Sequence, residues 1–275
     1  MASENALENL TGTIALAGAG KMGGAMLTGW LAGGLDPKRA IVIEPVVSDE
    51  IKALAAKGIR LNPSAKDIGP VETLVLAVKP QSFRDAGVAL KPFVGSSTLV
   101  VSIMAGTTIV SISEVCGGAV VRAMPNTPAA IGRGITVGVA AKNVSPAQRA
   151  VADALLQAIG KVEWVDDETL MDAVTAVSGS GPAYVFLLAE ELARAGVEAG
   201  LPDELATRLA RETVAGSGEL LRRSDASSAT LRQNVTSPGG TTAAALEVLM
   251  AKDGMQPLMI KAIAAATKRS RELAK

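Results

Sequence analysis

Residues 13–26, "TIALAGAGKMGGAM", decide the fold of this chain. A short apolar run ends at Gly18, and further glycines at 20 and 23 lead into a segment with helical apolar spacing. In a strand–turn–helix unit, the first glycine permits a tight turn and the second lets the backbone approach a pyrophosphate. The third allows the helix to pack closely on the strand, and the free N–H groups that begin the helix attract phosphates. We therefore predict a dinucleotide-binding turn made of Gly18, Gly20, Lys21, Met22 and Gly23.

Strand-like and helix-like segments alternate through the first half of the chain. Apolar strand-like runs cover 40–44, 73–78, 97–103 and 119–124, and we expect edge strands at 135–141 and 161–165. This alternation predicts βαβ units and a parallel sheet with helices on both faces. After about residue 168 only Ala-rich segments with helical spacing follow. The predicted fold class is α/β, with a Rossmann-type doubly wound sheet over residues 1–165 and an all-helical domain over 166–275.

Composition excludes several classes of function. Lys plus Arg and Asp plus Glu number 27 each, whereas nucleic-acid binders carry a basic bias. The chain has no run of 18 apolar residues, its N-terminal "MASENALENL" does not read as a signal peptide, and it has one cysteine. We expect a cytoplasmic protein without membrane or nucleic-acid partners. The absence of histidine excludes Ser–His and Cys–His catalysis, and we expect no metal site.

Glu44 is the candidate ribose ligand. It ends the strand-like run that follows the glycine turn, 26 positions after Gly18. A carboxylate there accepts hydrogen bonds from the ribose hydroxyls and repels a 2′-phosphate. It therefore favours NADH over NADPH, although a solvated acid at a strand end is the plain alternative.

Two other strand ends carry candidate cofactor ligands, because ligands bind at the carboxyl ends of strands in open α/β sheets. In "LAVKP", 76–80, Lys79 is placed to reach the cofactor, unless Val78 and Pro80 only end a strand and begin a helix. In "MPNTPA", 124–129, Asn126 offers its amide to a nicotinamide or a substrate, or else caps the turn between two prolines.

The helical half contains one segment that cannot pack a core, "VTSPGGTT" at 235–242. Ser237 and Pro238 begin a turn, two glycines free the backbone, and the threonines open a helix. Such a helix N-terminus with free N–H groups and hydroxyls binds anions, so we expect it to hold a substrate carboxylate. An ordinary N-cap is the alternative, but a cap needs one hydroxyl only. "SGSGPAY", 178–184, is a second small-residue segment and reads equally as a helix connection.

These motifs together resemble the Δ1-pyrroline-5-carboxylate reductase family. The resembling segments cover nearly the whole chain in the family's order, and they are 18–23, 77–80, 124–128, 178–184 and, most specifically, 235–242. The resemblance implies NAD(P)H-dependent reduction of the cyclic imine 1-pyrroline-5-carboxylate to L-proline, the last step of proline biosynthesis. It also implies a helical C-terminal domain interlocked with that of a dimer mate, often within a decamer. Exposed apolar helix faces independently predict dimerisation.

The resemblance also assigns roles to residues. The backbone of Gly240, Thr241 and Thr242 would bind the substrate carboxylate, and the Thr242 hydroxyl would contact the ring nitrogen, which makes it the candidate catalytic group. Ala77, Val78 and Lys79 would line the cofactor. Relatives that bind a 2′-phosphate carry a serine or a basic residue where this chain has Glu44-Pro45, a departure that again favours NADH.

Two other readings stay open. A β-hydroxyacid dehydrogenase or another imine reductase shares the two-domain plan, but "VFLLAEELAR" after Tyr184 lacks the lysine that the β-hydroxyacid enzymes place there. A non-catalytic NAD(H)-sensing protein is the third reading, but a sensor has no need of the second ligand loop at 235–242.

Overall fold

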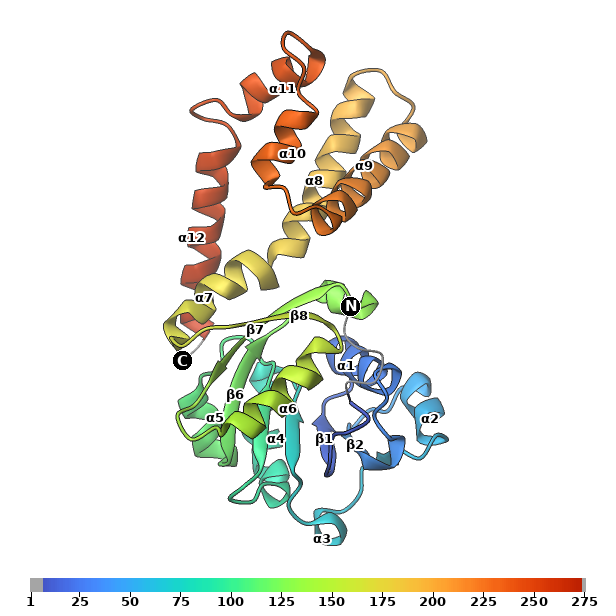
Figure 1. The fold of residues 1–275 in the computed structure, drawn as a ribbon, viewed down its shortest axis with the longest axis vertical. Coiled ribbons are helices and arrows are strands. Elements are labelled where there is room, and N and C mark those ends of the chain that lie inside the picture. The colour runs from blue at the N-terminus through green and yellow to red at the C-terminus, as the bar shows by residue number, and fades with distance from the viewer. Residues whose placement is uncertain (1–6, 274–275) are drawn as a thin grey trace. The chain divides into compact units, whose positions relative to one another are not determined.

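The computed structural model of this chain describes residues 7–273 (Figure 1). It forms two compact units. The first contains the residues before Ser180 and those from Thr267 onward, and the second is Ser180–Ala266. The boundary expected after residue 165 lies one residue beyond the last strand, which ends at Trp164, whereas the compact units divide after Gly179. The part of the N-terminal segment that precedes residue 7, which the sequence analysis used to exclude a signal peptide, lies outside the described residues.

The first unit is built on an eight-stranded sheet within the described residues, in the order β3-β2-β1-β4-β5-β6-β7-β8. The strands are β1 (Ile14–Ala17), β2 (Ala40–Ile43), β3 (Arg60–Leu61), β4 (Thr73–Leu76), β5 (Leu99–Ser102), β6 (Ala119–Met124), β7 (Gly134–Ala140) and β8 (Gly160–Trp164). All neighbours run parallel except β6 and β7, which are antiparallel. The chain reverses its strand order beside β1, where β2 lies on one side and β4 on the other. A reversal of strand order leaves a crevice at the carboxyl ends of the strands, and a doubly wound sheet binds its ligand there.

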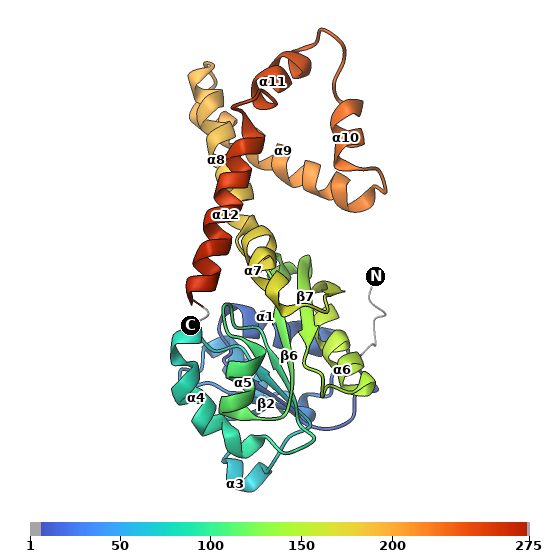
Figure 2. The same ribbon diagram turned by 90° about the vertical axis from the view of Figure 1, so that its left-hand side faces the viewer.

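Helices cover both faces of the sheet, as predicted. They are α1 (Lys21–Ala32), α2 (Asp49–Ala55), α3 (Ala65–Ile68), α4 (Phe83–Leu90), α5 (Ile109–Cys116) and α6 (Pro146–Gln157), and the short α7 (Met171–Val174) follows β8. Along β1, Ile14 and Leu16 join the core under α1 and α6, and Ala15 and Ala17 join the core under α4 and α5. Figure 2 shows α4 and α5 on one side of the sheet and α6 on the other. Alternate strand residues thus bury opposite faces, which explains the unbroken apolar runs of the sequence.

Helix starts follow the capping chemistry of the sequence. The Ser48 side chain accepts a hydrogen bond from the backbone of Ile51 at the start of α2. Ser145 and Gln148 form a reciprocal capping box at α6, with Pro146 in its first turn. These caps satisfy N–H groups that the first helical turn leaves without partners.

Two features of the first unit differ from what the sequence predicted. β3 has two residues only, too few for a periodic pattern. The segment 168–179, expected as one helix, is a 3₁₀ turn over Glu168–Leu170, then α7, then a π-helical turn over Thr175–Gly179. π-helical turns occur often at functional sites, and this one ends at a glycine of the site described below.

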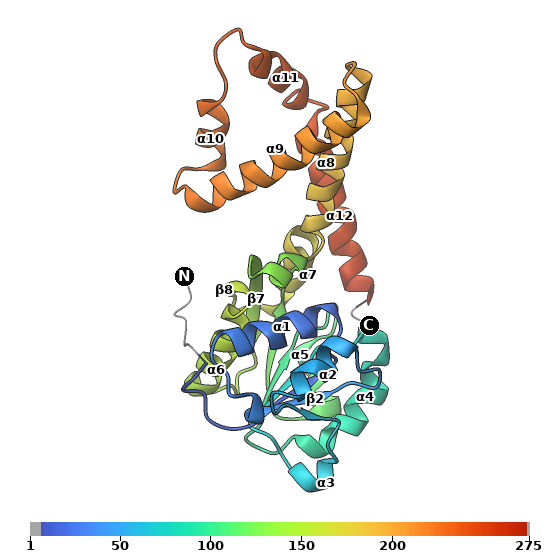
Figure 3. The same ribbon diagram turned by 90° about the vertical axis from the view of Figure 1, so that its right-hand side faces the viewer.

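The second unit is helical, as predicted. It contains α8 (Gly181–Glu198), α9 (Asp203–Arg223), α10 (Ser228–Asn234), α11 (Thr241–Leu249) and most of α12 (Met255–Leu273). α8 and α9 lie side by side (Figure 3), with Gly196 of α8 facing Ala206 of α9 closely enough that a Cβ on the glycine would lie 3.2 Å from the alanine Cβ. α8 buries none of its residues fully, and large apolar side chains are exposed on α8, α9, α11 and α12. Within the described residues, no helix is both long and apolar enough to cross a membrane.

Candidate active site

The glycine turn between β1 and α1 has the geometry that its spacing predicted. Gly18 has a φ of 92°, and a Cβ there would lie 2.6 Å from the carbonyl oxygen of Ala77. Gly23 packs against Gly18 so closely that a Cβ on it would overlap the Gly18 carbonyl oxygen. A Cβ on Gly20 would have nothing within 4 Å. Two glycines therefore serve the fold, and Gly20 leaves open space where a pyrophosphate can approach the backbone.

The N-terminus of α1 completes this turn. Its N-cap is Gly20, which has no side chain with which to cap the first helical turn. Lys21 is exposed, and Met22 points into the cavity described next. Free N–H groups and the positive end of the helix dipole therefore meet at the open side of the turn, which suits an anion.

Glu44 lies one residue beyond β2, and its carboxylate turns back to the glycine turn. Oε2 accepts a hydrogen bond of 2.7 Å from the N–H of Ala19, and Oε1 accepts one of 3.1 Å from the N–H of Val46. The predicted ribose ligand is thus placed at the predicted dinucleotide turn, although the two residues are 25 positions apart. A carboxylate has about four acceptor sites, so two of them remain for ribose hydroxyls.

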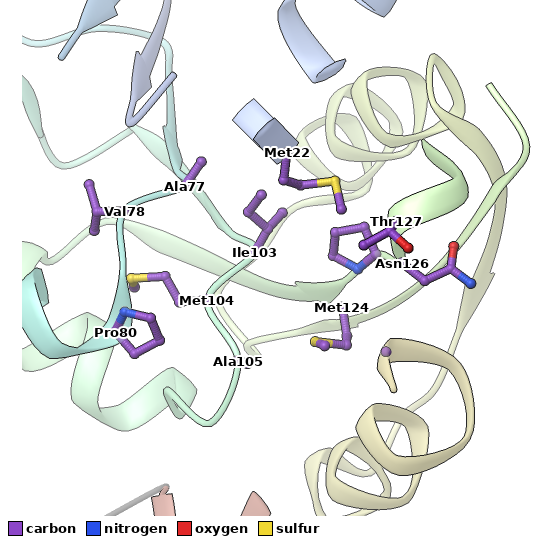
Figure 4. Close-up of a pocket in the computed structure, with 12 residues that line it drawn as sticks. Met22, Ala77, Val78, Pro80, Ile103, Met104, Ala105, Met124, Asn126 and Thr127 are labelled. Carbon is purple, nitrogen blue, oxygen red and sulfur yellow. The ribbon is translucent and has the colours of Figure 1, made fainter. Parts of the chain in front are cut away.

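A cavity of about 250 Å³ opens beside the turn, at the carboxyl ends of β4, β5 and β6 (Figure 4). Its lining is mostly apolar, and the residues are Met22, Ala77, Val78, Pro80, Ile103, Met104, Ala105, Met124, Pro125, Asn126, Thr127 and Gly179. Largely apolar walls with a few polar groups are typical of cofactor sites. Figure 4 shows side chains from separate segments gathered around this space, which suits the flat ring of a nicotinamide.

The cavity brings together several of the predicted residues. Met22, Ala77, Val78 and Asn126 line it, whereas Lys79 is exposed and is not part of the lining. The Asn126 Oδ1 accepts a hydrogen bond of 3.0 Å from the N–H of Ile135. Its carbonyl therefore holds the start of β7 and does not cap the turn between the two prolines, where Asn126 makes no side-chain capping bond, and its amide nitrogen is left to serve a ligand.

The segment that follows β5 also lines the cavity, although its sequence did not suggest a ligand site. Ile103, Met104 and Ala105 line the cavity directly beyond the last residue of β5, Ser102. The rule that ligands bind at strand carboxyl ends, applied to 76–80 and 124–129, would also have found them. Gly179 was quoted only as part of a small-residue segment. It ends the π-helical turn, and a Cβ there would overlap the terminal methyl of Met124, so a larger residue at this position of the wall would displace the Met124 side chain.

In the second unit, residues 235–240 form the turn that joins α10 to α11, and Thr241 and Thr242 begin α11. Gly239 has a φ of 69°, and the Gly240 N–H donates a hydrogen bond of 3.0 Å to the Ser237 carbonyl. Gly240 is also the N-cap of α11, and it brings no side chain to cap the first turn. Thr241 is exposed and Thr242 half-buried at the start of the helix. The predicted helix N-terminus is therefore formed, its role in binding an anion stays a prediction, and the Gly240 N–H is already used within the turn.

Cys116 and Asp167, which both lie outside the cavity lining, have shifted pKa values. Burial raises the pKa of the Cys116 thiol to about 11, against a smaller lowering by the Lys91 charge. Hydrogen bonds from the Thr169 side chain and backbone lower the pKa of the exposed Asp167 carboxyl. The buried thiol stays protonated near neutral pH, so Cys116 is a core residue of α5 and not a nucleophile.

Comparison with known proteins gives concordant matches. Residues 168–273 match the family model for pyrroline-5-carboxylate reductase dimerisation, and residues 13–106 match the model described as NADP oxidoreductase coenzyme F420-dependent. The chain is 44% identical to the pyrroline-5-carboxylate reductase of Synechocystis sp., over 87% of this chain and 89% of that protein. It is 40% identical to that of Pseudomonas aeruginosa, over 96% and 97%.

This chain belongs to the pyrroline-5-carboxylate reductase family. Solved structures agree: a pyrroline-5-carboxylate reductase of Coxiella burnetii superposes with a TM-score of 0.89 at 35% identity, covering 97% of this chain and all of that one. A Plasmodium falciparum pyrroline carboxylate reductase, solved with NADP bound, gives 0.81 at 30% identity, with 98% and 100% covered.

Membership in the pyrroline-5-carboxylate reductase family confirms the resemblance read from the five motifs, and the sheet with its separate helical unit confirms the predicted fold class. The chain is thus an oxidoreductase of an NAD(P)-dependent family. The family model for dimerisation matches residues 168–273, which include the helices whose apolar side chains are exposed in the single chain.

Proposed function

We propose that this chain reduces 1-pyrroline-5-carboxylate to L-proline with NAD(P)H, the last step of proline biosynthesis. The observation that carries the proposal is the apolar cavity beside an open glycine turn, in a chain 44% identical to a reductase of this name over 87% of its length.

The first unit fits a dinucleotide. The space at Gly20 and the uncapped start of α1 would hold the pyrophosphate, and Ala77, Val78 and Asn126 would lie along the nicotinamide end. When bound, the reduced nicotinamide supplies the hydride. The protein's part is to exclude water with the apolar wall and to fix the orientation of both rings.

The second unit would bind the substrate carboxylate at the N-terminus of α11. The Gly240 N–H is bonded to Ser237, so the backbone donors for the carboxylate belong to Thr241 and Thr242. The Ser237 hydroxyl, exposed in the same turn, would add a polar contact. A helix N-terminus favours a carboxylate through its free N–H groups and its dipole.

Proton supply explains why the chain needs no histidine. An imine nitrogen is basic enough to arrive protonated, and the iminium carbon then accepts the hydride without a strong acid from the protein. The Thr242 hydroxyl would orient the ring nitrogen. Catalysis in this scheme consists of positioning two reactants, which alone can supply a large part of a rate enhancement.

The preference for NADH is part of the proposal. The Glu44 carboxylate lies at the glycine turn, bonded to the Ala19 N–H, and a fixed negative charge there opposes a 2′-phosphate. Lys79 is exposed beside the cavity, and its side chain would contact the cofactor from the solvent side of the cavity.

The chain would assemble as a dimer through the helices of residues 166–275, which would act as the substrate-binding and dimerisation domain beside the dinucleotide-binding residues 1–165. The exposed apolar side chains of α8, α9, α11 and α12 support this assembly, because large exposed apolar patches mark surfaces that bind another protein. A decamer of such dimers, and the cytoplasmic location expected from composition, stay predictions. Light scattering at micromolar concentration tests the assembly, and a monomer would contradict it.

The deciding experiment is the initial rate of NADH and of NADPH oxidation in parallel assays with 1-pyrroline-5-carboxylate. Faster turnover with NADH supports both the reaction and the role of Glu44. Faster turnover with NADPH keeps the reaction and removes the Glu44 argument. Without oxidation of either cofactor, the reaction fails, and turnover with a β-hydroxyacid, or cofactor binding without any turnover, would support the two other readings.

A further inference from the structure

The carboxyl end of β2 is held by the side chain of Asn62, which directly follows β3. The Asn62 Oδ1 accepts a hydrogen bond of 2.8 Å from the Glu44 N–H, and its Nδ2 donates one of 2.9 Å to the Glu44 carbonyl. The Asn62 backbone N–H donates to the Val42 carbonyl at 2.8 Å. β3 has two residues only, so the amide continues the β2–β3 ladder where the backbone of β3 has ended.

Asn62 has an unusual backbone conformation, and packing in the core does not account for it. Among residues 7–273 it alone of the non-glycine residues has a positive φ, 45°. Asparagine tolerates this region better than most residues. The side chain is exposed and packs in neither core cluster of the first unit. In this conformation the Asn62 side chain forms two hydrogen bonds with the main chain of Glu44.

Glu44 is therefore fixed at both ends. Asn62 holds its main chain, and the N–H groups of Ala19 and Val46 hold its carboxylate. On the other side of β2, the Gly18 N–H donates to the Ile43 carbonyl at 2.9 Å. The negative charge consequently stays at the glycine turn instead of swinging into solvent.

We propose that Asn62 is a positioning residue for cofactor discrimination, because it holds the Glu44 carboxylate where a 2′-phosphate would lie. Repulsion excludes a ligand only if the repelling group cannot move away, and specificity is a difference between two affinities. Loosening Glu44 should therefore improve NADPH binding relative to NADH. The inference rests on the proposed function in taking Gly18–Gly23 as the dinucleotide site and Glu44 as the group that repels a 2′-phosphate.

The test compares four variants of the full chain. Asn62→Gly removes the amide and suits a positive φ, and Asn62→Ala removes the amide while keeping a Cβ. Glu44→Gln, alone and combined with Asn62→Gly, removes the charge that is being positioned. Asn143→Ala is the matched control, because it removes an amide that donates to the Gly118 carbonyl at 3.2 Å, outside the site. The dissociation constants of NADH and NADPH are measured by fluorescence titration without substrate.

We expect Asn62→Gly and Asn62→Ala to lower the ratio of the NADPH to the NADH dissociation constant by about threefold or more, since they loosen the repelling group without removing it. Glu44→Gln should lower the ratio further, and adding Asn62→Gly to it should change nothing. Asn143→Ala should keep the original ratio.

Two results would overturn the inference. The first is an unchanged ratio in Asn62→Gly, and a change confined to Asn62→Ala would then indicate backbone strain. The second is an equal effect of Asn62→Gly with and without the Glu44 charge. The titration contains no imine, so a chain that fails to reduce 1-pyrroline-5-carboxylate still reports this ratio. Failure of the proposed reaction and failure of this inference are therefore separable.

Discussion

Gly23 lies against Gly18 so closely that a Cβ on Gly23 would overlap the Gly18 carbonyl oxygen. The oxygen belongs to the turn and cannot move without disturbing β1, because the Gly18 N–H is bonded to Ile43 of β2. This one contact sets how closely α1 packs on the sheet. It also distinguishes Gly23, which is needed for packing, from Gly20, at which a Cβ would have nothing within 4 Å.

Gly23→Ala should destabilise the first unit. Overpacking of a closely packed position typically costs about 1–3 kcal/mol, and the gain in helix propensity from alanine offsets at most about 1 kcal/mol of it. Urea unfolding measures the loss. Gly24→Ala is the control, because its Cβ would make an ordinary contact of 3.5 Å with the Ala19 carbonyl. Equal stability of the two variants would contradict the assigned packing role.

Gly20→Ala should have the opposite profile. Gly20 has an extended conformation that alanine adopts freely, and its Cβ would have nothing within 4 Å. Stability should therefore stay within about 0.5 kcal/mol of the original chain. The added methyl would occupy the space for the pyrophosphate, so the dissociation constant of NADH should rise about tenfold or more, which is roughly 1.4 kcal/mol. Unaltered NADH binding in a titration would remove Gly20 from the cofactor site.

Thr242→Ala should lower kcat/KM for 1-pyrroline-5-carboxylate by about tenfold or more, equivalent to roughly 1.4 kcal/mol of transition-state stabilisation. The variant loses the hydroxyl that would orient the ring nitrogen and keeps the backbone N–H groups of α11. Its dissociation constant for the cofactor should not change. Thr28→Ala, which removes an exposed hydroxyl from α1, provides the control, and an equal kcat/KM in both variants would discard the role of Thr242.

Glu168→Gln should destabilise the first unit through Arg122 of β6. The guanidinium is 5% exposed, and its Nη1 lies 2.8 Å from the Glu168 Oε1, which also accepts the Ile109 N–H. Removing the carboxylate charge leaves a buried cation poorly paired, at a cost of about 1–3 kcal/mol because Glu168 is partly in water.

The control for this ion pair is Asp49→Asn. Asp49 pairs with Lys52 on the surface, with side chains 97% and 62% exposed. Exposed pairs contribute about 0–1 kcal/mol, so urea unfolding should show a clearly smaller loss than for Glu168→Gln. Losses of equal size would show that burial of Arg122 does not matter.

Cys116 should make stability depend on pH in the alkaline range. Its pKa is raised from 9.0 to about 11 in the folded chain, first because burial disfavours the thiolate. Above pH 9 the unfolded chain loses this proton while the folded chain keeps it, so the free energy of unfolding falls as pH rises toward 11. Below that window the contribution is constant. Cys116→Ala should lack this part of the slope, and parallel stability curves for the two proteins between pH 8 and 11 would contradict the shift.

Most of the fold follows from patterns that are local in the sequence. Apolar runs mark β1, β2, β4, β5 and β6 because strands covered on both faces need a continuous apolar stretch. Ser48 and Ser145 mark helix starts because a hydroxyl at the N-cap satisfies the nearest free N–H groups. β3 escaped prediction because two residues show no periodicity, and the π-helical turn escaped because its spacing resembles that of an α-helix.

The sequence by itself determined that a glycine turn joins the first strand to a helix, which glycines make it, and that an acid follows the next strand, because glycine spacing and strand ends are properties of neighbouring residues. Tertiary structure alone decided that residues of distant segments line one cavity and what holds that acid. Met22, Met104 and Met124 line the same cavity because the strand order brings three distant segments to the carboxyl ends of neighbouring strands. Asn62 reaches Glu44 because β2 and β3 lie side by side, and a hydrogen bond between neighbouring strands leaves no periodic trace in the chain.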